Sequence, residues 1–196
     1  MFTFAISLSA VTFGAHLSKL LLPYFPTPKP PSRPIRYALS ALAVLVYAAA
    51  YPAYFRMSPR FRHEATAALL FSFPGTLSRY LLSIFLNPRL KLFPLGTFTA
   101  NMVGTALLGT FQVLRSIQHP GPLSVNACDV LQGLADGYCG CLTTVSTFAA
   151  EVDALPPRQA WLYALLSWLV GQILLAIILG PSIGVGHVSR EITCRF

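Results

Sequence analysis

The sequence predicts an all-α membrane protein in which a four-helix unit with a broken third helix follows two additional transmembrane helices. Hydrophobic residues make up 55% of the 196 residues and charged residues only 10%. The mean hydropathy is +0.62, and so little charge cannot cover the surface of a soluble domain. The apolar residues form long blocks that approach the ~20 residues needed to cross a bilayer. One block contains glycines followed by a run of hydroxyl side chains, a composition that disfavours a continuous helix.

The apolar blocks define the predicted spans, which cover 1–23, 37–54, 65–86, 95–114, 125–150 and 161–179. The first block has no basic n-region and no small-residue cleavage site after it, so we interpret it as a span rather than a signal peptide. The segment PYFPTPKPPSRP is dense in proline, which lacks the N–H that a helix needs, so we expect an extended linker there. The predicted division is 1–23 (spanning helix), 24–36 (Pro-rich linker), 37–55 (spanning helix), 64–180 (four-helix unit) and 181–196 (C-terminal tail).

The charged and metal-binding residues exclude several classes of function. The formal net charge is +8, but the basic residues lie mainly between spans, where they meet lipid headgroups, and they form no soluble nucleic-acid-binding domain. Lysine and arginine divide almost evenly between alternate loops, so they do not assign an orientation. Cys139 and Cys141 have no nearby histidine or further cysteine to complete a zinc set, and we expect them to pack as small residues. No acid, base and nucleophile converge, so an enzyme is not expected.

Two polar residues inside the spans point to a specific role, because such residues are costly at membrane depth. Arg79 lies within 65–86. It either reaches the headgroups from a helix end or lies near a wet cavity, and the apolar residues that follow it favour the cavity. Asn101 lies within 95–114, one turn before Gly104. It either links two helices through its amide or donates a hydrogen bond to a permeant anion.

The stretch CGCLTTVSTFA, at 139–149, predicts an interrupted helix. Three preceding or included glycines and the β-branched hydroxyl residues weaken the helix. Unpaired backbone is tolerated at membrane depth only inside protein or beside a cavity, so we expect this segment to line a cavity. The alternative is that the hydroxyls bond carbonyls four residues earlier. Glu151 and Asp153 follow the span and are expected to be solvated. The glycines are Gly133, Gly137 and Gly140.

The last span places Tyr163, Ser167 and Gly171 on one face, four residues apart. Together with PGTLSRYLLS, FPLGTFTANMVGTALLG and LQGLADGYCGCLTTVSTFAAE, this face resembles the fluoride channel family, which comprises bacterial Fluc (CrcB) proteins and eukaryotic FEX fluoride exporters. The resemblance covers about 65–180 and implies a four-helix Fluc-type repeat that packs antiparallel to a partner unit. FEX proteins fuse two repeats through an inverting helix. Accordingly, 37–55 resembles that helix, and 1–23 resembles the last helix of an incomplete first repeat.

The resemblance also implies roles for individual residues. Asn101 matches the family's pore asparagine, and the backbone carbonyls of Gly140 and Thr143 match positions that hold a structural Na+ between the units. Phe148 matches one of two pore phenylalanines, whereas Val145 stands at the other position and departs from the bacterial pattern. The resemblance thus assigns the fluoride pore to Asn101, Ser146, Thr147, Phe148, Arg79 and Tyr163.

These roles imply a plasma-membrane fluoride channel that lowers cytoplasmic fluoride by passive permeation. Its expected partners are fluoride, the lipid bilayer and an antiparallel unit, either the missing first repeat or a second copy of the chain. Its expected cofactor is the structural Na+, with no organic cofactor and no nucleic acid. Two alternatives stay open. One is a non-conducting structural half of a fluoride exporter, and the other is an ion-coupled secondary transporter.

Overall fold

The structure is a computed structural model that describes residues 2–21, 31–58, 67–116 and 124–184. Across these residues the chain is helical and contains no strand, which confirms the predicted all-α class. Four of the described helices are long and apolar enough to cross a membrane, namely Thr3–Leu21, Arg33–Arg56, Ala67–Arg89 and Pro157–Ser182. Most of the predicted linker 24–36 and of the tail 181–196 lies outside the described residues.

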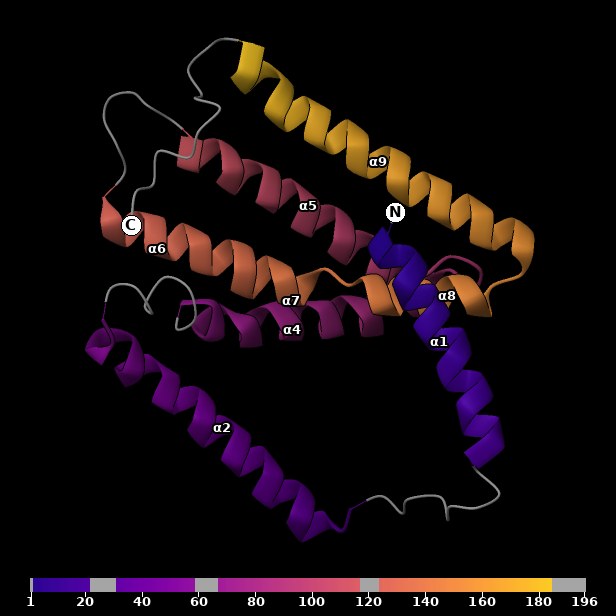
Figure 1. Cartoon of the computed structure of the whole chain (residues 1–196), viewed down its shortest axis with the longest axis horizontal. Coiled ribbons are helices and arrows are strands. Elements are labelled where there is room, and N and C mark those ends of the chain that lie inside the picture. The colour runs from indigo at the N-terminus through magenta and orange to yellow at the C-terminus, as the bar shows by residue number, and fades with distance from the viewer. Residues whose placement is uncertain (1, 22–30, 59–66, 117–123, 185–196) are drawn as a thin grey trace.

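The helices follow the order of the predicted spans (Figure 1). Their bounds are α1 Phe2–Leu21, α2 Arg33–Arg56, α4 Ala67–Leu86, η2 Asn87–Arg89, α5 Leu95–Ser116, α6 Val125–Gly133, η3 Leu134–Cys139, α7 Gly140–Leu142, α8 Val145–Ala154 and α9 Pro157–Gly184. The fifth predicted span is therefore divided into four short elements, of which η3 is a π-helix.

Two predicted boundaries are wrong, and each lies beside a proline. The linker was expected to extend to residue 36, but α2 already begins at Arg33. Pro34 lies in its first turn, where a helix does not need the missing N–H. At the other end of the chain, α9 continues past Gly180 to Gly184 with Pro181 inside it. A proline can be accommodated near the end of a membrane helix because only one hydrogen bond is lost.

The four-helix unit consists of α4, α5, the interrupted segment α6–α8, and α9. In it, α4 packs against η3, α7 and α5, while α5 packs against α9 (Figure 1). Close packing of α4 on η3 requires glycine. A Cβ atom on Gly75 would overlap the backbone carbonyl of Tyr138, and one on Gly137 would overlap that of Ala68. These glycines therefore allow two membrane helices to touch, rather than serving to break one.

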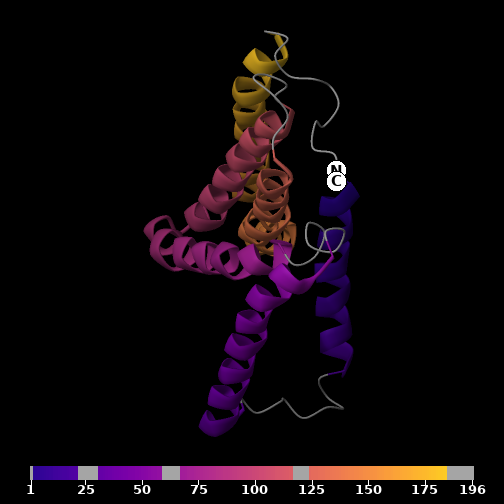
Figure 2. The same ribbon diagram turned by 90° about the vertical axis from the view of Figure 1, so that its left-hand side faces the viewer.

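The two N-terminal helices attach to the unit at separate places and project away from it (Figure 2). The hydroxyl of Tyr47 on α2 donates to the carbonyl of Leu70 on α4 at 2.6 Å. The Tyr47 ring also lies 5.3 Å from that of Phe73. By contrast, α1 packs against α8. Among the described residues, the additional helices thus meet the four-helix unit through α2 on α4 and α1 on α8.

The contact between η3 and α4 predicts that Gly137→Ala destabilises the fold. The new methyl group has no room beside the Ala68 carbonyl, and overpacking of this kind costs about 1–3 kcal/mol. Thermal unfolding of the purified chain in detergent measures the loss. Gly14→Ala is the matched control, because a Cβ there meets nothing within 4 Å and alanine favours a helix. Equal unfolding temperatures for the two variants contradict the prediction.

Candidate functional site

The predicted interruption of the fifth span is confirmed, and it lies at Thr143 and Thr144. Thr143 has ψ 152°, and Thr144 has φ −153° and ψ 128°, so both residues are extended between α7 and α8. The glycine-containing segment before them remains helical, as the π-helix Leu134–Cys139. The expectation that the glycines weaken the helix was therefore wrong in position, since all three lie before the break. Gly133 and Gly137 serve close packing on α4, whereas a Cβ at Gly140 would meet nothing within 4 Å.

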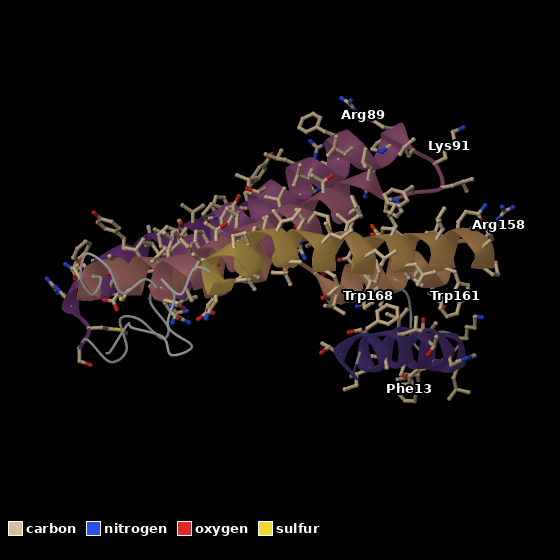
Figure 3. The ribbon with its side chains drawn as sticks, turned by 90° about the horizontal axis from the view of Figure 1, so that it is seen from above. Phe13, Arg89, Lys91, Arg158, Trp161 and Trp168 are labelled. Carbon is tan, nitrogen blue, oxygen red and sulfur yellow. The ribbon has the colours of Figure 1, made fainter. Side chains whose placement is uncertain are left out.

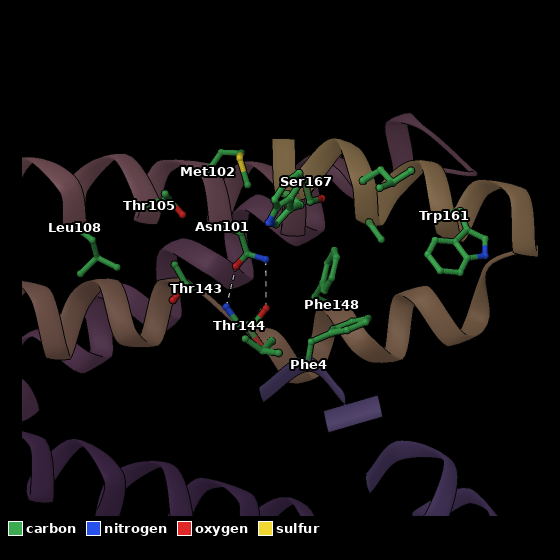
Figure 4. A pocket seen from close by; sticks show the side chains of 14 residues that line it. Phe4, Asn101, Met102, Thr105, Leu108, Thr143, Thr144, Phe148, Trp161 and Ser167 are labelled. Atoms are coloured by element: carbon green, nitrogen blue, oxygen red, sulfur yellow. Dashed lines mark hydrogen bonds between the residues drawn. The ribbon is translucent and has the colours of Figure 1, made fainter. Parts of the chain in front are cut away.

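Asn101 on α5 supplies the hydrogen-bond acceptor that the break removes from the Thr144 N–H, and it also donates to the Thr144 carbonyl. The backbone N–H of Thr144 donates to Asn101 Oδ1 at 2.8 Å, and Asn101 Nδ2 donates to the Thr144 carbonyl at 3.3 Å. Figure 4 shows both bonds as dashed lines. In an uninterrupted helix the Thr144 N–H would bond the Gly140 carbonyl instead. One side-chain amide thus pairs both polar groups of an extended residue with a neighbouring helix.

The hydroxyl residues at and just after the break have three different roles. Thr143 Oγ1 donates to the Cys139 carbonyl at 2.9 Å, which is the back-bonding that the sequence left as an alternative. Thr144 Oγ1 accepts from the Thr147 N–H at 3.3 Å and so caps the start of α8. Ser146 and Thr147 are exposed, although their hydroxyls lie 3.3 and 3.2 Å from Thr144 Oγ1.

A cavity of about 610 Å³ opens beside the break. Asn101 and the two break residues line it together with Phe148 of α8, and side chains of α9 and α1 complete the wall (Figure 4). Most of the lining is apolar, so the few polar atoms determine what binds. Among the described residues, the second N–H of the Asn101 amide has no hydrogen-bond acceptor, since only the bond to Thr144 uses Nδ2.

Ser167 on α9 also lines this cavity. Its Oγ is buried and has no hydrogen-bond partner within the described part of the chain. The sequence placed Ser167 on a packing face with Tyr163 and did not assign it to the site. The four-residue spacing of Tyr163 and Ser167 does not indicate which neighbouring helix the Ser167 hydroxyl faces. Only the packing of α9 on α5 brings it opposite Asn101.

Glu151 corrects the expectation of a solvated carboxylate beyond the span. It is half-buried and accepts hydrogen bonds from Thr97 Oγ1 at 2.6 Å and from the Tyr163 hydroxyl at 2.9 Å. Thr97 and Tyr163 are 1% and 0% exposed. The carboxylate therefore ties α5 and α9 to α8 just behind the cavity wall. These partners lie far apart in the sequence, so periodicity within one helix could not identify the cluster.

The structure brings together some of the predicted pore residues and separates others. Asn101 and Phe148 line the cavity, and Tyr163 packs behind it with its ring 4.8 Å from that of Phe148. Ser146 and Thr147 adjoin the break without lining the cavity. Arg79 is half-buried on α4 and lies outside the cavity lining. Of the two predicted Na+ positions, Thr143 lines the cavity, whereas Gly140 is exposed.

The pairing of Asn101 with Thr144 predicts that Asn101→Leu increases backbone opening at the break. Leucine has a similar size but restores neither hydrogen bond, each of which contributes about 0.5–1.5 kcal/mol. Hydrogen–deuterium exchange of the peptide covering 139–149 should therefore become faster. Thr110→Val is the control on the same helix, because Thr110 is exposed and bonds only its own helix, at Ala106. Unchanged exchange in the Asn101 variant contradicts this role.

Comparison with known proteins places this site in a family. A family model described as CrcB-like protein, Camphor Resistance (CrcB), matches residues 66–181. The bacterial fluoride-specific ion channel FluC of Salmonella arizonae is 37% identical over 100 residues, which are 50% of this chain and 74% of that protein. The family model thus covers α4, α5, the break, and α9 as far as Pro181.

Longer fungal proteins are also similar. Fluoride export protein 1 of Neurospora crassa is 48% identical over 121 residues, 62% of this chain and 23% of that protein. Fluoride export protein 1 of Saccharomyces cerevisiae is 34% identical over 152 residues, 74% of this chain and 40% of that protein. The chain therefore spans less than half the length of these fungal relatives. Because the family model matches more than half of the chain and the described helices include four candidate spans, the chain belongs to the CrcB-like family of integral membrane proteins.

Proposed function

We propose that the chain forms part of a fluoride-selective pathway that lowers cytoplasmic fluoride by passive permeation across the plasma membrane. The similar proteins named fluoride export protein 1 and fluoride-specific ion channel FluC support this substrate. The proposed activity is transport without a covalent step, so the chain is not an enzyme. Fluoride that enters as the neutral acid ionises in a neutral cytoplasm and then leaves as the anion.

The observation that carries the proposal is the convergence of hydrogen-bond donors in a largely apolar cavity. Fluoride is small and strongly hydrated, so a pore must replace its water with donors. The remaining N–H of Asn101 supplies one such donor. Ser167, whose buried hydroxyl has no hydrogen-bond partner among the described residues, lines the same cavity from another helix. Phe148 supplies a ring whose edge carries partial positive charge. Such contacts hold an anion weakly enough to release it, which conduction requires.

The placement of the Glu151 carboxylate supports passive permeation. Glu151 accepts hydrogen bonds from Thr97 and Tyr163 and lies half-buried behind the cavity wall. Its two donors occupy one oxygen each, so the carboxylate serves to join three helices. A coupled transporter needs a titratable group or an ion site that changes partners during the cycle. The proposed pathway requires only that Asn101, Ser167 and Phe148 keep their positions.

A structural Na+ and an antiparallel partner unit belong to the same proposal. The Na+ would be held by the backbone carbonyls of Gly140 and Thr143, because oxygen ligands suit a hard cation. The diversion of the Thr144 N–H to Asn101 removes the helical partner of the Gly140 carbonyl. Gly140 is exposed, and a Cβ there would meet nothing within 4 Å, so the face it presents is open to a second unit. That unit would be either a first repeat or a second copy of the chain.

A second candidate function is a non-conducting structural half of a fluoride exporter. The exposed positions on α8 favour it, because Ser146 and Thr147 are exposed and do not line the cavity, and Val145 is 41% exposed. A polar track made of Ser146 and Thr147 needs another unit to enclose it. Under this alternative, the chain supplies Asn101 and the break while the conducting surface is completed elsewhere.

Fluoride efflux from liposomes distinguishes these functions. The purified chain should release fluoride but not chloride, and release should need no imposed cation gradient. Asn101→Asp should lower the rate about tenfold or more, because losing a donor to the anion raises the barrier by roughly 1.4 kcal/mol. Thr110→Val, exposed on the same helix, should match the parent chain.

The other outcomes identify the alternatives. Efflux that depends on a Na+ or proton gradient indicates a coupled transporter. Absence of efflux until a complete first repeat is co-expressed indicates the structural half.

The Na+ proposal predicts a stability difference that does not depend on transport. Thermal unfolding in detergent should occur at a higher temperature in NaCl than in N-methylglucamine chloride at equal ionic strength, because a cation bound only to the folded state stabilises it. The organic cation is too large for a carbonyl cage. Identical unfolding temperatures in the two salts contradict a Na+ site in this chain.

A further inference from the structure

Helix α1 contacts the four-helix unit along one narrow face. Among residues 3–21 only a stripe spaced three and four residues apart is half-buried, while the remaining residues are exposed. This spacing is that of one helical face. It packs against α8, the helix that follows the break. The stripe consists of Phe4, Ser7, Leu8, Val11 and Thr12.

Phe4 lies at the end of this stripe that reaches the cavity. Its ring centroid is 5.5 Å from that of Phe148, with the planes tilted by 54°. Phe148 in turn lies 4.8 Å from Tyr163 at 51°. Figure 4 shows Phe4 and Phe148 beside each other across from Asn101. Phe4 is therefore the contribution of α1 to the same cavity that Asn101 and Ser167 line.

We propose that Phe4 is an anion-contacting residue of the permeation pathway. The proposal deepens the fluoride function above and rests on it. In a tilted pair, each ring can direct its partially positive edge toward the space beside its neighbour. An anion between Asn101 and the Phe4–Phe148 pair would meet hydrogen-bond donors on one side and ring edges on the other. The family match begins at residue 66, so it does not assign a role to this residue.

The other side chains that line the cavity are less suitable sources of a partially positive ring edge. Val145 lies one turn before Phe148 on α8 and lines the cavity, but it is aliphatic. Trp161 and Trp168 also line it, but they are 70% and 53% exposed. Phe4 is half-buried and is held by its contact with Phe148. It is therefore better positioned than the tryptophans to meet an ion that has lost its water.

Phe13 provides a matched control on the same helix. It is 68% exposed and lies outside the half-buried stripe. Figure 3 shows it on the side of α1 that faces away from α9 and from Trp161 and Trp168. Substitution at Phe13 changes the lipid-facing surface of α1 without touching the cavity.

The first test compares Phe4→Leu with Phe13→Leu in the liposome assay. Leucine keeps an apolar side chain but removes the ring edge. Phe4→Leu should lower fluoride efflux about threefold to tenfold, the range expected for one aromatic interaction. Phe13→Leu should leave efflux unchanged. Equal efflux from the parent chain and both variants overturns the proposal.

The second test does not require transport and retains the ring. 4-Fluorophenylalanine is incorporated at position 4 or position 13 of the full chain, and its ¹⁹F resonance is followed in detergent during titration with NaF or NaCl. The resonance at position 4 should shift with NaF and much less with NaCl. The resonance at position 13 should not move in either salt. A position-4 resonance that responds equally to both salts, or to neither, overturns the role of Phe4.

The two tests separate this inference from the proposed function. A shift at position 4 in a chain that does not conduct supports fluoride binding beside Phe4 and contradicts conduction by this chain alone. If the chain conducts fluoride and neither test shows an effect at position 4, the proposed fluoride pathway stands but Phe4 is not part of it. A chain that neither conducts nor shows a shift contradicts both.

Discussion

A buried peptide group without a hydrogen-bond partner costs roughly 2–7 kcal/mol, and the break at Thr144 would leave such groups at membrane depth. Asn101 resolves this problem with one side chain, since its amide both accepts from the Thr144 N–H and donates to the Thr144 carbonyl. The extended backbone can therefore persist without water. The break at the centre of the site depends on this pairing, because it satisfies the Thr144 backbone while Thr144 Oγ1 caps the start of α8.

Helix packing around the break depends on two further constraints. Gly75 and Gly137 let α4 and η3 approach until backbone meets backbone. On the other side, the Glu151 carboxylate joins Thr97 and Tyr163 and so holds α5 and α9 against α8. One region of the unit is therefore fixed by van der Waals contact and another by hydrogen bonds. This arrangement keeps the few polar atoms of an apolar cavity in defined positions.

The contact between α1 and α8 extends the site beyond the four-helix unit. Only the face of α1 that bears Phe4 meets α8, and the rest of the helix is exposed. The aromatic contact from Phe4 through Phe148 to Tyr163 joins α1 to α9 across the cavity wall. A helix outside the matched region thus completes the lining of the cavity.

The sequence by itself determined the membrane class, the order of the helices and the existence of a broken span. These follow from hydropathy and from local backbone preference, which act within about twenty residues. It also singled out Asn101 as a polar residue within a span, and the resemblance to a known family implied Phe148. Tertiary structure alone decided that the break falls at Thr144, that Glu151 is bonded rather than solvated, and that Ser167 and Phe4 reach the cavity. Each of these depends on which residues of distant helices face one another, and no pattern within a single helix contains that information.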